Sequence, residues 1–152
     1  KYARQFIAKK ISLSYEPVET TVITDKKWLS FVIEQVISNA VKYTKTGGIK
    51  IYLEDGDGTM SVPVQKASHR KEDDGENSGM KSVRLVIEDT GIGIRAEDLP
   101  RICEMGYPGC NGHEGQHSSG IGLYLCSRIL KKLGHTFSIT SKEGVGTVVK
   151  IG

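Results

Sequence analysis

Glycine is unevenly distributed along this chain. Eight of its 18 glycines, at positions 91, 93, 106, 109, 112, 115, 120 and 122, fall within one stretch of the sequence. Two close pairs adjoin apolar runs: Gly91 with Gly93 follows a strand-like run, and Gly120 with Gly122 precedes a helix-like run. Glycine adopts turns that other residues avoid and lets a ligand approach the backbone closely. We therefore expect regular elements separated by two glycine turns that are open to a ligand.

The spacing of apolar residues predicts strands and helices that do not strictly alternate along the chain. About five strands and three helices form an α+β two-layer sandwich, in which a mixed, mostly antiparallel sheet is covered by helices on one face. We expect strands at 11–16, 20–24, 49–54, 82–88, 136–141 and 145–151, with the first two joined as a hairpin at Pro17. We expect helices at 1–10, 26–44 and 121–133, with Asp25 as an N-cap and a short helix at 95–105 broken near Pro100.

Length and composition predict a single domain, residues 1–152, with two segments that lack apolar periodicity. Residues 56–81 are rich in Gly, Asp, Glu, Lys and Ser, so we expect a disordered, dispensable insert. Residues 106–119 are rich in glycine, and we therefore expect them to form a mobile loop. A net charge of +3 without a basic block predicts no nucleic-acid partner. No apolar run approaches the ~18 residues of a membrane helix.

The first residue and the cysteines indicate what kind of protein this chain comes from and where in the cell it works. The chain opens on Lys1 rather than Met, so we expect it to be a piece of a longer protein. Its three cysteines include no CxxC pair, which favours a reducing cytoplasm over a disulfide framework.

The predicted helix 26–44 carries a polar column along one flank of its apolar face. At about 100° per residue its core stripe consists of Leu29, Ile33, Val36 and Ala40. Gln35, Asn39 and Lys42 form the separate column, and Glu34 lies about 140° from Asn39. An amide oxygen suits Mg²⁺ and an ammonium suits phosphate, although a solvated helix flank has the same pattern.

Two further motifs surround the glycine pairs. Residues 88–94 (EDTGIGI) end a strand in a turn, where Asp89 is placed to accept hydrogen bonds from an exocyclic amine; an ordinary turn is the alternative. Residues 118–123 (SSGIGL) lead into a helix, whose free N–H groups bind phosphate. A dinucleotide-binding fold is the competing interpretation, but no strand precedes this glycine pair.

Together these motifs resemble the ATP-binding domain of sensor histidine kinases, a fold shared with type II topoisomerases, heat-shock chaperones and mismatch-repair ATPases. ISNAVKY (37–43) resembles the N-box, DTGIGI (89–94) the G1 box, LPRICEMGY (99–107) the F-box and SSGIGLYLC (118–126) the G2 box. GVGTVVKI (144–151) is similar to the closing strand. Residues 25–47 and 121–135 look most like the intramembrane-sensing kinases of cell-envelope and bacitracin response.

The resemblance implies a role for each matching residue. Asn39 would bind Mg²⁺ with help from Gln35, Lys42 would meet phosphate and Tyr43 would lie against the nucleotide. Asp89 would receive the adenine amino group, supported by Thr147. The turn beside the base would comprise Gly91, Gly93 and Ile94, and the phosphate-binding segment would comprise Ser119, Gly120, Ile121, Gly122 and Leu123. Residues 106–119 would be the lid over ATP.

Two departures from the family pattern matter. Hydrolytic relatives carry Glu at the position of Gln35, and a neutral amide cannot act as a general base, which favours phosphotransfer over hydrolysis. Residues 102–119 contain no Lys or Arg, which leaves His113, Gln116 and His117 as lid candidates for phosphate contact. The same region holds Cys103, Cys110, His113 and His117, but this order matches no standard zinc finger, and we interpret these residues as incidental.

The resemblance implies the cytoplasmic catalytic domain of a membrane sensor protein, attached to the membrane only through a missing N-terminal part. Its cofactors would be ATP and Mg²⁺. Its partners would be the dimerisation domain that carries the phospho-accepting histidine and, indirectly, a response regulator. The alternatives are a nucleotide-sensing regulatory module without phosphotransfer and a conformational ATPase.

Overall fold

The computed structural model describes residues 2–17, 20–56, 82–108 and 119–152. Within them the order of elements is α1 (Ala3–Lys9), β1 (Ser12–Tyr15), α2 (Lys26–Tyr43), β2 (Gly48–Asp55), β3 (Val83–Asp89), α3 (Gly122–Leu133), β4 (Phe137–Lys142) and β5 (Gly146–Ile151). The described residues contain no helix that is both long and apolar enough to cross a membrane.

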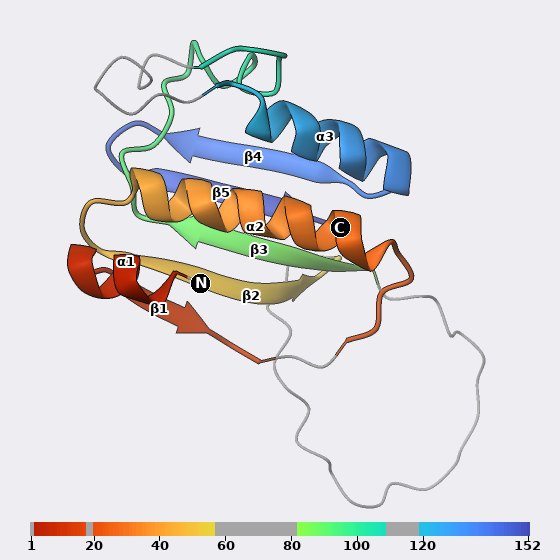
Figure 1. The fold of residues 1–152 in the computed structure, drawn as a ribbon, viewed down its shortest axis with the longest axis horizontal. Helices are drawn as coiled ribbons and strands as arrows, with labels where there is room; N and C mark the ends of the chain where they lie inside the picture. The colour runs from red at the N-terminus through yellow and green to blue at the C-terminus, as the bar shows by residue number, and fades with distance from the viewer. Residues whose placement is uncertain (1, 18–19, 57–81, 109–118) are drawn as a thin grey trace, which may run out of the picture.

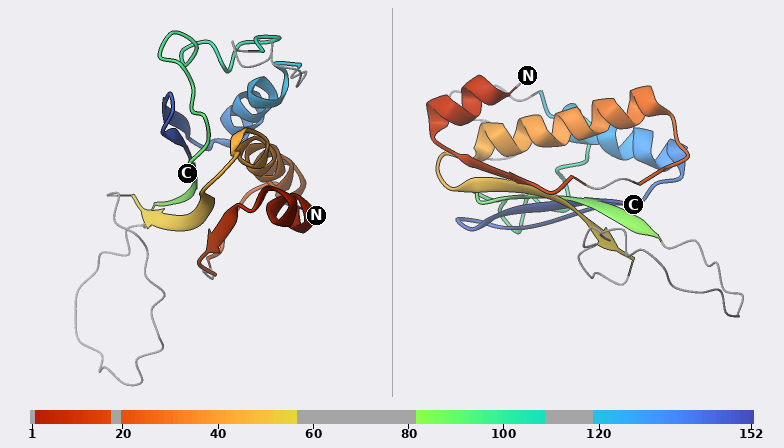
Figure 2. Two further views of the ribbon diagram at one scale, coloured as in Figure 1. Left: turned by 90° about the vertical axis from the view of Figure 1, so that its left-hand side faces the viewer. Right: turned by 90° about the horizontal axis from the view of Figure 1, so that it is seen from below.

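The strands form one mixed sheet in the order β1-β2-β3-β5-β4 (Figure 1). β1 runs parallel to β2, and the other neighbours are antiparallel. All three helices lie on one side of this sheet, which the right-hand view of Figure 2 shows edge-on. The expected α+β two-layer sandwich is therefore confirmed.

The core lies between the sheet and α2 and α3. It contains Val32, Val36, Ala40 and Val41 from α2, Cys126 and Leu130 from α3, and Ile49, Ile87, Val149 and Ile151 from the sheet. The predicted stripe of α2 was partly wrong, because Leu29 and Ile33 are only half-buried while Val32 and Val41 are fully buried. The sulfur of Cys126 lies 4.0 Å from the carbonyl oxygen of Val32, so α3 packs against a flank of α2 that the stripe left out.

Both ends of α2 are held by charged side chains. Asp25 is the N-cap, as predicted, and its carboxylate accepts the N–H groups of Lys27 at 2.9 Å and Trp28 at 3.1 Å. At the other end, the ammonium of Lys9 in α1 donates to the carbonyl oxygens of Val41 at 2.6 Å and Lys42 at 3.0 Å. A lysine at this end satisfies helix carbonyls that lack a partner within the helix.

Two expected elements were wrong. Residues 20–24 form no strand and no hairpin with β1, whose partner is β2. A parallel pair needs a crossover, so the chain leaves β1 towards the start of α2 instead of turning back. Residues 95–105 form successive turns rather than a helix, with hydrogen bonds from Asp98 N to Arg95 O and from Arg101 N to Asp98 O. Pro100 lacks the N–H that a continuous helix needs there.

Candidate functional site

A cavity of about 330 Å³ opens between α2, the start of α3 and the carboxyl end of β3. Its apolar walls come from Val36, Ile87, Ile102, Ile139 and Val149, among others. A mostly apolar cavity with a few convergent polar groups is the usual form of a small-molecule site. The polar lining comprises Gln35, Ser38, Asn39, Lys42, Tyr43, Asp89, Asp98, Tyr107, Ser119 and Thr147.

The polar column of α2 faces this cavity. Gln35, Asn39 and Lys42 all line it, whereas Glu34 is exposed and is not part of the lining. Lys42 also lies over the Tyr43 ring, with its nitrogen 5.1 Å from the ring centroid. Lys42 is the one cation among the described lining residues.

Asp89 is the buried carboxylate of the cavity, 8% exposed at the end of β3. Its Oδ1 accepts the N–H of Gly91 at 2.8 Å. Burial raises the pKa of this carboxyl above its ordinary value, hydrogen bonds from the backbone of Gly91 and Thr147 lower it, and Glu88 raises it further. An ionised carboxylate here has lost most of its water, which makes it a strong acceptor for a ligand donor.

The first glycine turn packs too closely for side chains. A Cβ on Gly91 would lie 2.7 Å from both Asp89 Oδ1 and the carbonyl oxygen of Tyr43. Gly93 has φ +70°, and a Cβ there would lie 2.1 Å from the carbonyl oxygen of Lys142. Ile94 N–H donates to Ser141 Oγ at 2.9 Å, which fastens the turn to the β4–β5 hairpin. These contacts hold Asp89 against the cavity.

The second glycine turn places the start of α3 beside the polar column. The N-cap residue, Ile121, makes no side-chain capping hydrogen bond within the described part of the chain. A Cβ on Gly122 would lie 3.0 Å from Gln35 Oε1. Uncapped N–H groups at a helix N-terminus, next to amide and ammonium side chains, suit an anionic ligand.

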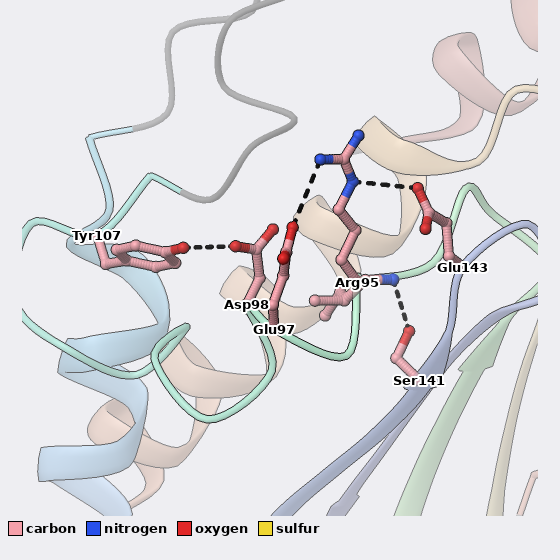
Figure 3. A network of polar contacts seen from close by, with 7 residues as sticks. Arg95, Glu97, Asp98, Tyr107, Ser141 and Glu143 are labelled. Carbon is pink, nitrogen blue, oxygen red and sulfur yellow. Dashed lines mark hydrogen bonds and ion pairs between the residues drawn. The ribbon is translucent and has the colours of Figure 1, made fainter.

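Sequence reasoning missed three polar residues of the cavity, namely Ser38, Asp98 and Tyr107. Asp98 is 3% exposed, and the Tyr107 hydroxyl donates to its Oδ1 at 2.5 Å (Figure 3). Nearby, Arg95 forms ion pairs with Glu97 and Glu143 on the outer side of the same segment. Tyr107 lies within the F-box-like residues 99–107, a match that implies no role for this side chain, and no local pattern distinguishes Ser38 or Asp98.

Most of the predicted site residues come together in this cavity. The lining includes Gln35, Asn39, Lys42, Tyr43, Asp89, Gly93, Ile94, Ser119, Gly120, Gly122, Leu123 and Thr147. Gly91 and Ile121 are not part of the lining. The roles predicted for all of them stay predictions.

Several predictions concern residues outside the described ranges. These are most of the insert (57–81), most of the lid (109–118), and the lid candidates His113, Gln116 and His117. Of the four possible zinc ligands only Cys103 is described, and the described residues contain no group of three His, Cys, Asp or Glu that could hold a metal ion.

Residues 24–152 match the family described as "Histidine kinase-, DNA gyrase B-, and HSP90-like ATPase". The chain is 36% identical over 132 residues to the sensor histidine kinase YxdK of Bacillus subtilis, a match covering 85% of this chain and 33% of that protein. It is 34% identical over 134 residues to the sensor protein kinase GraS of Staphylococcus aureus, covering 88% of this chain and 32% of that protein. The chain thus spans about a third of the length of these relatives.

Solved structures support the fold. The full-length ShkA complex with AMPPNP matches 99% of this chain and 27% of its own with TM-score 0.69 at 20% identity. The nucleotide-free catalytic domain of the histidine kinase ThkA matches 99% of this chain and 82% of its own with TM-score 0.68 at 19% identity. The resemblance to a sensor-kinase catalytic domain is confirmed, and the chain belongs to the family of histidine kinase-, DNA gyrase B- and HSP90-like ATPases.

Proposed function

We propose that this domain binds ATP in the cavity and presents its γ-phosphate to a histidine on a dimerisation segment outside the 152 residues. The observation that supports this most strongly is the convergence of unlike polar groups on one cavity. A buried carboxylate, Asp89, is joined there by the amides of Gln35 and Asn39, the ammonium of Lys42 and the N-terminus of α3. Asp89 would accept the adenine amino group, and the other groups would hold the phosphates.

Phosphate charge would be balanced from a small set of groups. Lys42 and the first N–H groups of α3 are the positive contributions among the described lining residues. A protein that transfers a phosphoryl group works mainly by positioning it and stabilising its charge. Asn39 and Gln35 therefore orient the phosphates, while Asp89 fixes the base.

The donor set also fits Mg²⁺. Asn39 offers a hard amide oxygen within the cavity, and magnesium is commonly held by one or two protein ligands together with substrate phosphates and water. When bound, Mg²⁺ would neutralise phosphate charge. We assign Asn39 as its protein ligand, with Gln35 in support.

In the proposed reaction, the histidine that accepts the phosphoryl group lies outside these 152 residues. His135, the histidine in the described residues, has both ring nitrogens engaged, with Thr24 Oγ1 at 2.8 Å and the carbonyl oxygen of Gly152 at 3.2 Å. Since this chain matches only 33% of the sensor histidine kinase YxdK, we propose a cytoplasmic domain of a membrane sensor that acts on its own dimerisation helix and, through it, on a response regulator.

The proposal is tested by joining the chain to a dimerisation segment that carries its histidine. With ATP and Mg²⁺ it should form phosphohistidine, and Asn39→Ala should abolish transfer while weakening binding of the adenine moiety much less. Glu34→Gln, on the exposed side of the same helix, is the matched control and should transfer normally. Tight ATP binding without phosphohistidine would instead favour the nucleotide-sensing module.

A further inference from the structure

Tyr107 is anchored on two sides at the edge of the cavity. Its hydroxyl donates to the buried carboxylate of Asp98, and the Arg101 guanidinium carbon lies 4.3 Å from its ring centroid. A hydrogen bond to a carboxylate is among the stronger ones in proteins, and a guanidinium over a ring adds an attraction of its own. Both contacts restrain the side chain of Tyr107, whose hydroxyl points at the Asp98 carboxylate in Figure 3.

The backbone of Tyr107 in turn supports the second glycine turn. Gly106 N–H donates to the carbonyl oxygen of Gly120 at 3.2 Å. A Cβ on Gly120, whose φ is +64°, would lie 2.6 Å from backbone atoms of both Gly106 and Tyr107. The two backbones touch, so a shift of Tyr107 displaces Gly120.

Gly120 is two residues before the first residue of α3. Asp98, Tyr107, Gly120 and Gly122 all line the cavity, so the chain of contacts runs from a buried carboxylate to the helix N-terminus along one wall. Catalytic geometry depends steeply on such positioning, since a misplacement of about 1 Å can cost ~100-fold in rate.

We propose that Asp98 is a positioning residue for phosphate binding. It holds Tyr107, Tyr107 supports Gly120, and Gly120 sets the place of the N–H groups that open α3. This inference rests on the proposed function, because it assumes that phosphates bind at that helix end. Asp98 itself need not touch the nucleotide.

The test compares nucleotides with and without phosphates on the full chain. In Tyr107→Phe the ring and its contact with Arg101 remain, but the bond to Asp98 is lost. Affinity for ATP and ADP should fall about five- to tenfold, while affinity for adenosine changes less than about twofold. Asp98→Asn keeps an oxygen that can accept from the hydroxyl and should retain most of the ATP affinity, whereas Asp98→Leu should match Tyr107→Phe.

Tyr15→Phe is the matched control, because this tyrosine lies exposed on β1 and should bind every ligand as the unmodified chain does. Melting temperatures should be measured for each variant. An equal loss for adenosine and ATP in Tyr107→Phe, or no loss for either, would overturn the positioning role. If the unmodified chain binds neither ATP nor adenosine, the proposed ATP-binding function is wrong. That result differs from the ones that would overturn the positioning role of Asp98, so the experiment separates the two hypotheses.

Discussion

Gln35 and Gly122 lie side by side in the lining of the cavity. The amide oxygen of Gln35 is 3.0 Å from the position that a Cβ on Gly122 would occupy. The contact joins the polar column of α2 to the first turn of α3. Whatever chemistry occurs at that helix end occurs beside a neutral amide. The identity of residue 35 therefore bears directly on whether water can be activated there.

Replacing Gln35 by Glu should raise ATP hydrolysis by the chain. A carboxylate at this position can take a proton from water, and a well-positioned general base contributes ~100- to 10,000-fold, so a gain of about tenfold or more is expected. Phosphate release measured over hours, with ATP saturating, checks this. The unmodified chain should hydrolyse ATP very slowly.

The same assay on Glu34→Gln should show no change, because Glu34 is exposed and does not line the cavity. Robust hydrolysis by the unmodified chain that vanishes in Glu34→Gln would contradict both the assignment of Gln35 and the phosphotransfer function.

Asp89→Asn should weaken ADP binding by about ten- to a hundredfold. An asparagine presents an amide that also donates, and losing one hydrogen bond to a charged group costs roughly 1.5–3 kcal/mol. Calorimetric titration of both proteins with ADP measures the difference. Equal affinities would remove Asp89 from the base-binding role.

The same substitution should have the opposite effect on the stability of the nucleotide-free chain. Burial raises the pKa of Asp89 in the folded protein above its unfolded value, so the carboxyl favours folding when protonated and loses that contribution as pH rises through the folded pKa. At neutral pH Asp89→Asn should therefore melt at a higher temperature than the unmodified chain. The difference in melting temperature between the two proteins should shrink as the pH is lowered below the pKa that Asp89 has in the folded chain. A difference that grows at low pH would contradict this prediction.

Cys126 should resist thiol reagents in the folded chain. Burial raises its pKa to about 12, with a smaller contribution from Cys103 in the same direction. Since the thiolate is the reactive form, a thiol whose pKa is raised this far is almost entirely protonated and unreactive at pH 8. Mass spectrometry after labelling should find Cys126 unmodified until denaturant is added; fast labelling in the native state would show that α3 opens readily.

On the face of the sheet away from the helices, Lys150 Nζ lies 2.8 and 3.0 Å from the two carboxylate oxygens of Glu54. Lys150→Met should lower the free energy of unfolding by about 2–4 kcal/mol, because it leaves the 3% exposed carboxylate of Glu54 with Arg84, at 3.7 Å, as its one ion-pair partner among the residues that the structure describes. Denaturant unfolding measures this loss. The double variant Glu54→Met, Lys150→Met should lose less than the single one.

The features that could be predicted from the residues alone are those that depend only on residues close together in the sequence. The column of Gln35, Asn39 and Lys42 follows from helical geometry alone, and the turn at Gly91 and Gly93 follows from what glycine permits. Such signals need no knowledge of which segments meet. They account for Gln35, Asn39, Lys42 and Gly93 in the cavity lining, whereas Tyr43, Ile94 and Thr147 were expected there only from the family resemblance.

Features that depend on distant segments could not be predicted in this way. Asp98 is an unremarkable acidic residue in a run of turns until the fold closes Tyr107 over it. Residues 20–24 have strand-like composition, yet β2 takes the only paired edge that β1 has within the described residues. Which partner a strand finds is decided by the packing of the whole sheet, and composition does not carry that information.

Asp55 faces Val83 in the antiparallel register of β2 and β3, so the connection between these strands starts and ends at adjacent backbone positions. Closing a flexible loop costs entropy that grows only with the logarithm of its length, about 0.6 kcal/mol for each doubling. Asp89 and the cavity lie at the other end of β3, about 20 Å away at the usual rise per residue. A fluorescent reporter spliced into this connection would thus be attached to the sheet at the end of β3 opposite Asp89.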